Sequence, residues 1–162
     1  MRTIFITLVL LAASPAAFAD EVRFDGGVVS GFGMGEIRYA FSPIDSVQLE
    51  AGFGGGLGGV HGSFVPKLVV GKGRTRLLAG AGVSVGNEGF LGISQRGPMA
   101  WLLVEAFGME YRLDSGVFVS GGAGFAIGLS GEYCVDCGGS MDYRPLTSLI
   151  IPQARFGLGY AF

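Results

Sequence analysis

Apolar and polar residues alternate over most of the chain, with the period of two that is typical of β-strands. The segment 46–54 illustrates the pattern, because its odd-numbered positions are apolar and its even-numbered positions are polar or glycine. The same two-faced pattern recurs in 116–129 and in 149–162. The alternation therefore predicts a protein built of β-strands, each with one apolar face.

Eight strands follow from this pattern and from the residues that interrupt it. Turns are predicted at 42–45, 71–74 and 113–116, where Gly, Pro, Asp and Ser gather. The longer connections, near 57–62, 87–98 and 130–148, then fall at the opposite end of the fold. The first strand is the least regular, because Asp25-Gly26-Gly27 interrupts it. The strands are expected near 21–30, 34–41, 46–57, 62–71, 75–86, 99–112, 116–129 and 149–162.

The chemistry of the two faces favours a barrel in a membrane over a soluble sandwich. The less apolar faces consist largely of Gly, Ala and Ser, which suit the narrow interior of a small barrel better than a solvated surface. Strands of about 10–14 residues also match a tilted crossing of a bilayer. The predicted fold class is all-β, an eight-stranded antiparallel up-and-down transmembrane β-barrel. An aromatic belt is expected near the short turns, at Tyr39, Phe41, Tyr111, Tyr160 and Phe162.

Composition and charge narrow the function classes. The chain has 162 residues, enough for one domain, and its 31 glycines all follow residue 19. Because each interior glycine disfavours a helix by about 1 kcal/mol, the composition argues against a helical domain. The net charge of −2 provides no basic surface, so no nucleic-acid partner is expected.

The first 19 residues have the three parts of a secretory signal peptide. Arg2 supplies a positive start, residues 4–13 form a short apolar core, and Ala17-Phe18-Ala19 supplies the small residues of a cleavage site. We therefore expect cleavage after Ala19 and a barrel domain over residues 20–162. The expected location is the cell outer membrane, with membrane lipid as the surrounding partner.

Charged residues on the inward faces predict a network inside the barrel. An eight-stranded barrel has an interior just wide enough for side chains, and an unpaired buried ion costs several kcal/mol. The inward charges are therefore expected to pair across the lumen and to plug it near the short turns. They are Glu36, Arg38, Glu50, Lys67, Arg76, Glu110, Arg112 and Arg155.

The same alternation makes two further predictions about the interior. The half of the lumen away from the short turns should be roomier and should admit a small apolar ligand. It is expected to be lined by Gly52, Gly54, Gly82, Gly122 and Gly124. In the strand 99–112, Glu105 falls on the outward face with Trp101, Leu103 and Phe107, where a carboxylate facing lipid would be costly. Either a bulge near 106–108 or a different register would turn Glu105 inward.

The C-terminal residues carry a family resemblance. The segment Phe156-Gly-Leu-Gly-Tyr-Ala-Phe162 resembles the last strand of bacterial outer-membrane β-barrels, and 37–43 and 109–114 resemble their strand-to-turn junctions. In size the chain is similar to the eight-stranded OmpA/OmpX-type barrels. The resemblance implies that Tyr160 and Phe162 belong to a signal read by the barrel assembly machinery. It also implies that the short turns face the periplasm.

The two cysteines, Cys134 and Cys137, lie in the longest predicted outer loop of an exported protein. That compartment favours a disulfide between them. A zinc site needs about four ligands, and the chain has a single histidine, His61. No metal and no other cofactor is therefore expected.

His61 and Ser63 are the candidates for catalysis. Residues two apart on a strand share a face, so the imidazole and the hydroxyl can meet. The pair resembles that of small outer-membrane lipid A deacylases, although those enzymes carry it in a late strand, and no carboxylate is evidently paired with it in the sequence. The favoured function is non-enzymatic, a structural or surface- and ligand-binding barrel with possible partners at loops 87–98 and 130–148. A lipid-modifying enzyme is the alternative.

Overall fold

The computed structural model describes residues 20–28, 34–56, 59–87, 95–134 and 142–162. The predicted signal peptide, residues 1–19, and one of the two cysteines, Cys137, lie outside this described part. Among the described residues, no helix is long and apolar enough to cross a membrane.

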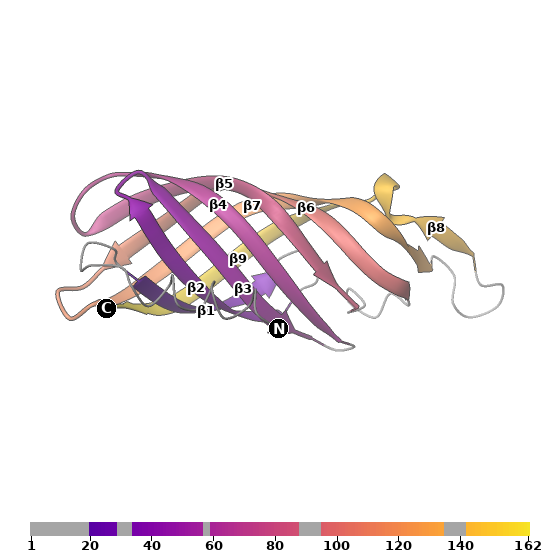
Figure 1. Ribbon diagram of the computed structural model, residues 1–162, viewed down its shortest axis with the longest axis horizontal. Coiled ribbons are helices and arrows are strands. Elements are labelled where there is room, and N and C mark those ends of the chain that lie inside the picture. The colour runs from indigo at the N-terminus through magenta and orange to yellow at the C-terminus, as the bar shows by residue number, and fades with distance from the viewer. Residues whose placement is uncertain (1–19, 29–33, 57–58, 88–94, 135–141) are drawn as a thin grey trace, which may run out of the picture.

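Eight strands form a closed antiparallel barrel (Figure 1). Strands β1 to β7 pair in sequence order, and β9 closes the barrel between β7 and β1. The predicted fold class of an eight-stranded up-and-down barrel is confirmed, and each strand lies near its expected position. The bounds are β1 Asp20–Val28, β2 Met34–Ile44, β3 Val47–Gly55, β4 Val60–Val70, β5 Thr75–Gly86, β6 Gln95–Arg112, β7 Val117–Cys134 and β9 Ile150–Ala161.

The two ends of the barrel differ. The turns after β2, β4 and β6 gather at one end with the C-terminus, at the left of Figure 1, and we name this the short-turn end. Gly71 and Gly116 in these turns have φ values of 114° and 87°, which L side chains rarely adopt. The opposite end is named the loop end. There the short strand β8 (Tyr143–Pro145) pairs with the end of β7 and leads into a 3-10 turn, η2 (Leu146–Ser148).

The outward faces of the strands form an apolar belt. Phe53, Leu68 and Phe156 are 64%, 64% and 76% exposed, and most other outward positions of the described strands are apolar too. The aromatic residues predicted for a belt, which include Tyr39 and Tyr160, lie on this surface toward the short turns. Soluble monomers rarely expose an apolar surface this continuous. The surface therefore suits a hydrocarbon surrounding.

The register of β6 differs from the sequence prediction. A β-bulge between Glu105 and Phe107 leaves both Ala106 and Phe107 facing outward, so the alternation changes sign at this point. Trp101, Leu103 and Glu105 consequently face the interior, where Glu105 is 7% exposed. The uniform alternation that put these three side chains outward was wrong. Of the two explanations that the sequence allows for Glu105, the bulge is the one present in the structure.

The loop-end half of the lumen is packed. A Cβ atom on Gly82 would lie 2.1 Å from the carbonyl oxygen of Phe64, and one on Gly124 would lie 1.9 Å from that of Val104. These glycines therefore let neighbouring strands approach and curve, and do not leave open space. The expectation of a roomier half was wrong, because neighbouring side chains and strands occupy the space beside these glycines. A Cβ atom on Gly52 would meet the Glu36 carboxylate, and one on Gly54 would meet the His61 ring. That expectation had rested on Gly52, Gly54, Gly82, Gly122 and Gly124.

Candidate functional site in the barrel interior

Acidic and basic side chains balance inside the barrel. The structure places all eight of the predicted charged residues in the lumen, with Arg76 and Arg112 keeping 12% and 18% side-chain exposure near the short-turn end. Four further charges join them, so the network of described residues holds equal numbers of acids and bases. The acids are Glu21, Asp25, Glu36, Glu50, Glu105 and Glu110, and the bases are Arg23, Arg38, Lys67, Arg76, Arg112 and Arg155.

Sequence reasoning missed Glu21, Arg23 and Asp25 on β1 and placed Glu105 outward. The signal in β1 was available, because its charges stand at every second position. Gly26-Gly27 interrupt the alternation directly after these charges, and this obscured the signal. The predicted set held more bases than acids, and an excess of buried positive charge would have been unstable. Requiring equal numbers of buried acids and bases would have indicated that further inward acids exist.

Glu50, on β3, is the centre of the network. Its carboxylate lies 2.9 Å from a guanidinium nitrogen of Arg23 and 2.9 Å from one of Arg38. The Nζ atom of Lys67 is 2.7 Å away, and Arg155 approaches to 3.6 Å. Glu50 is 1% exposed. One buried carboxylate therefore compensates four cations that come from four other strands.

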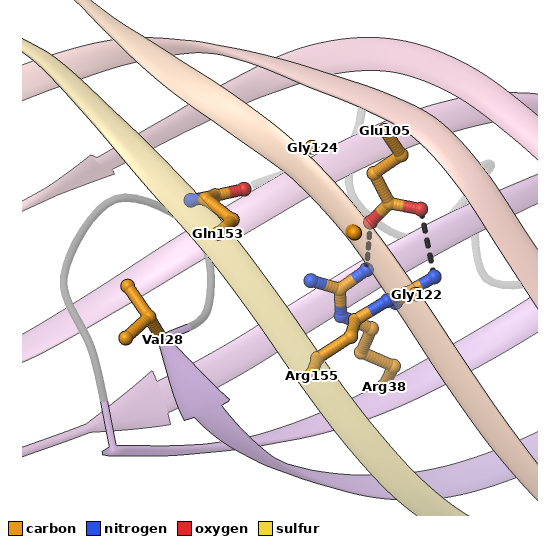
Figure 2. Close-up of a pocket in the computed structure, with 8 residues that line it drawn as sticks. Val28, Arg38, Glu105, Gly122, Gly124, Gln153 and Arg155 are labelled. Carbon is orange, nitrogen blue, oxygen red and sulfur yellow. Dashed lines mark hydrogen bonds and ion pairs between the residues drawn. The ribbon is translucent and has the colours of Figure 1, made fainter.

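Glu105, brought inward by the bulge, ties β6 to the same cations. Figure 2 shows its carboxylate between two guanidinium groups, with Arg38 at 2.9 Å and Arg155 at 2.7 Å. Lys67 lies 2.5 Å from the same carboxylate. Beside this cluster, Gln153 helps to line a cavity of about 10 Å³, a volume near the smallest that admits one water molecule.

A second layer of the network lies nearer the short-turn end. Glu21 pairs with Arg76 at 2.9 Å and with Arg112, and Glu110 pairs with Arg112 at 3.1 Å. The Arg112 guanidinium also lies over the ring of Phe118, 5.4 Å from its centroid. Arg23 joins the two layers, because it contacts Glu110 at 3.2 Å as well as Glu50.

The loop-end half of the lumen contains an apolar cluster. Trp101 of β6 is 0% exposed, and Leu146 of η2 is 1% exposed and reaches into the same cluster. Val28, Tyr133 and Leu149 pack against it from the rim. The lumen thus has a charged half and an apolar half, and both are filled. The cluster consists of Val65, Met99, Trp101, Leu103, Ala126, Leu146 and Ile151.

His61 and Ser63 lie on the lumen side of β4, and a carboxylate does face them. The Ser63 hydroxyl donates a hydrogen bond to Glu36, and the His61 Nε2 atom is 4.0 Å from the same carboxylate. His61 is 1% exposed. A hydrolase needs its serine activated by the histidine and open to substrate. In this structure the Ser63 hydroxyl is directed to the Glu36 carboxylate, and Ser63 is half-buried.

The remaining candidate residues lie at the ends of the fold. Cys134 ends β7 and is buried, but its predicted partner Cys137 falls outside the described residues, so the disulfide stays a prediction. Tyr160 and Phe162 lie at the short-turn end of β9, where their rings make an edge-to-face contact at 5.4 Å. Among the described residues, no group of His, Cys, Asp and Glu is arranged to hold a metal ion.

Comparison with known proteins bears on the fold. Among solved structures, the chain is similar to a major outer membrane protein from Thermus thermophilus. The TM-score is 0.54, and the match covers 91% of this chain and 100% of that chain at 15% sequence identity. The fold is that of a small outer-membrane β-barrel. No family model and no curated protein matches the sequence.

Proposed function

We propose that this barrel resides in an outer membrane as a non-conducting structural or surface protein. The observation that carries the proposal is the filled lumen. The short-turn half is occupied by ionisable side chains, with equal numbers of acids and bases in the network. The loop-end half is occupied by an apolar cluster. A barrel of eight strands has little interior width to spare once side chains fill it.

The surface supports the membrane part of the proposal. The outward residues of the described strands form an apolar belt, and aromatic residues stand near its short-turn edge. The signal peptide expected at residues 1–19 supports export. In cell fractionation, the protein should appear in the outer membrane with Asp20 at its N-terminus. Recovery from the soluble periplasmic fraction would contradict the proposal.

The filled lumen is tested by electrical recording. Wild-type protein in planar bilayers should give no steady conductance, because buried side chains of the described strands fill the lumen. An Arg155→Ala variant removes a cation that contacts both Asp25 and Glu105. It should be less stable than Leu158→Ala, which changes only the outward face. A large, steady wild-type conductance would mean that the lumen is open and would overturn the proposal.

Assembly offers an independent test of the C-terminal signature. We propose that Phe162 is read by the barrel assembly machinery, as the resemblance of the last strand implies. Deleting Phe162 should reduce the amount of folded barrel in the outer membrane. Replacement of the equally exposed Phe156 by Ala is the control, since it keeps the terminal residue. Equal insertion of the wild type and the deletion would remove the assembly signal from the proposal.

A further inference from the structure

An apolar wall inside the loop-end half of the barrel requires a cover. Met99, Trp101 and Leu103 from β6 form one apolar cluster with Val65 of β4 and Ile151 of β9, and each is buried. These β6 residues belong to the part of the strand toward the loop end, at the right of Figure 1, which β6 and β7, the longest strands, both reach. Apolar surface left open to water is unfavourable in proportion to its area. The structure supplies the cover from the segment that follows the longest loop.

The cover is the segment Tyr143–Ser148, made of β8 and η2, and we name it the cap. Leu146 is its one fully buried side chain, at 1% exposure, whereas Arg144, Pro145, Thr147 and Ser148 are exposed. The cap therefore covers the apolar wall with a single leucine. Its other side chains remain wholly or partly on the surface.

The wall is shaped to receive the cap. A Cβ atom on Gly128 would lie 2.1 Å from the carbonyl oxygen of Leu146, so only glycine lets the cap come this close. The Gly128 amide donates to the carbonyl oxygen of Leu149 at 3.0 Å. In addition, β8 pairs with β7 over three residues, and Leu146 is the one fully buried side chain of the cap. Small elements with few buried contacts open locally at low free-energy cost.

The floor beneath the apolar cluster is closed. Gln153 and Glu105 stand one inward position below Ile151 and Leu103, and Arg155 stands one inward position below Gln153. All three line the cavity of about 10 Å³ (Figure 2). A molecule that entered from the loop end would meet paired charges there. It would bind in the apolar half and could not pass through.

We propose that the space occupied by Leu146 is a binding site for the end of a linear hydrocarbon chain. The chain enters from the loop end when the cap lifts, and its terminal carbons replace the leucine side chain against Trp101 and Met99. Met99 favours such an exchange, because an unbranched thioether side chain adapts to irregular partners. This inference rests on the proposed function, since it assumes a barrel whose charged half stays shut.

The chain carries its own reporter for this site. Trp101 is the single tryptophan of the sequence, and it is 0% exposed in the wall of the apolar cluster. Protein in phosphatidylcholine vesicles would be titrated with 10-bromodecanol, whose bromine quenches tryptophan fluorescence at short range. We expect quenching that saturates. In Leu146→Ala the half-saturating concentration should fall about tenfold, because the competing side chain is gone.

A matched pair of variants separates the lumen from the membrane around it. Ala126 faces the apolar cluster and Ala123 faces outward on the same strand. Ala126→Phe should fill the site and abolish the saturable quenching, and Ala123→Phe should leave it unchanged. The proposal is overturned if quenching rises linearly with probe and is alike in the wild type and Leu146→Ala.

The conductance of the same vesicles distinguishes this inference from the proposed function. If no current flows and Leu146→Ala does not lower the half-saturating probe concentration, the hydrocarbon site is contradicted and the closed barrel remains supported. If the wild type conducts steadily, the proposed closed barrel is contradicted, and so is the assumption on which the hydrocarbon site rests. If Leu146→Ala binds tightly and remains non-conducting, both stand, because the charged half still seals the lumen.

Discussion

The two halves of the lumen are filled by opposite means. In the short-turn half, ionised side chains such as Glu50 and Arg38 lie within 4.0 Å of opposite charges and depend on one another for compensation. In the loop-end half, Trp101 and Leu103 need only apolar neighbours of suitable volume. Buried charges must be matched in number and position, whereas apolar cores tolerate exchanges that keep their volume. The charged half therefore specifies the register of the strands more strictly.

This difference also explains why the bulge in β6 lies where it does. Glu105 is the inward residue at which the apolar cluster ends and the charged network begins. On its short-turn side, Met109 and Tyr111 face outward, and Glu110 faces inward. One extra residue at 106 lets Glu105 and Glu110 both face inward, although they are an odd number of residues apart. The boundary between the halves is thus also a break in the strand.

The largest expected effect is the loss of the central carboxylate. Glu50→Gln keeps the volume of the side chain but leaves four cations without one of their partners. Removing one member of a buried ionic cluster costs about 3–5 kcal/mol. Urea unfolding in lipid vesicles, followed by Trp101 fluorescence, should register this loss. The same change at exposed Glu132 is the control and should leave the midpoint unmoved. Equal midpoints for the two variants would mean that Glu50 carries no compensation.

Much of the fold could be predicted from the sequence, because the alternation is local. In β3 and β9 the predicted inward and outward faces agree with the structure at every position that the alternation assigned, including Glu50 and Arg155. A membrane barrel favours such alternation, since charges are unfavourable on the outward face and the inward face lies in a narrow lumen. Glycine at inward positions was recognised, but its role was misjudged. It was expected to leave space, and it instead brings strands together.

The interior of the loop-end half could not be predicted by the same reasoning. Trp101 and Leu103 enter the lumen only because of the bulge, and an alternating pattern carries no mark of one extra residue. The one sequence signal of the bulge was Glu105, a carboxylate that uniform alternation would place facing lipid. Leu146 lies in a segment without periodicity, so its insertion depends on tertiary packing.

The apolar half should also lose stability when one of its side chains is shortened, by a somewhat smaller amount. Leu103→Ala leaves a cavity in a packed cluster, and such changes cost about 2–5 kcal/mol. Leu102→Ala, one residue away and facing outward, should cost less than half as much, because lipid fills the space that the shorter side chain leaves. Thermal unfolding in vesicles measures both variants. A loss at 102 as large as at 103 would contradict the inward assignment that the bulge produces.

A smaller effect is expected where only strand approach is disturbed. Gly124→Ala places a methyl group 1.9 Å from the carbonyl oxygen of Val104, and the backbone must shift to relieve the contact. Overpacking of this kind costs about 1–3 kcal/mol. Gly121→Ala on the same strand meets its nearest atom, on Phe156, at 3.7 Å and should be tolerated. Refolding yields and urea midpoints that fail to separate the two variants would remove the close-approach role of Gly124.

The smallest effect should come from an ion pair outside the lumen, and it sharpens the contrast most directly. Arg74 and Asp114 pair between two of the short turns, but their side chains are 59% and 82% exposed. Water already solvates both charges, so Arg74→Ala should cost less than about 1 kcal/mol. Raising the salt concentration to about 0.5 M should erase even that difference, because ions screen exposed pairs over a few ångströms. The deficit of Glu50→Gln should persist under the same salt, since its partners are buried from the counterions. If salt removed both deficits alike, solvent would have access to the charged half, and the closed lumen would not hold.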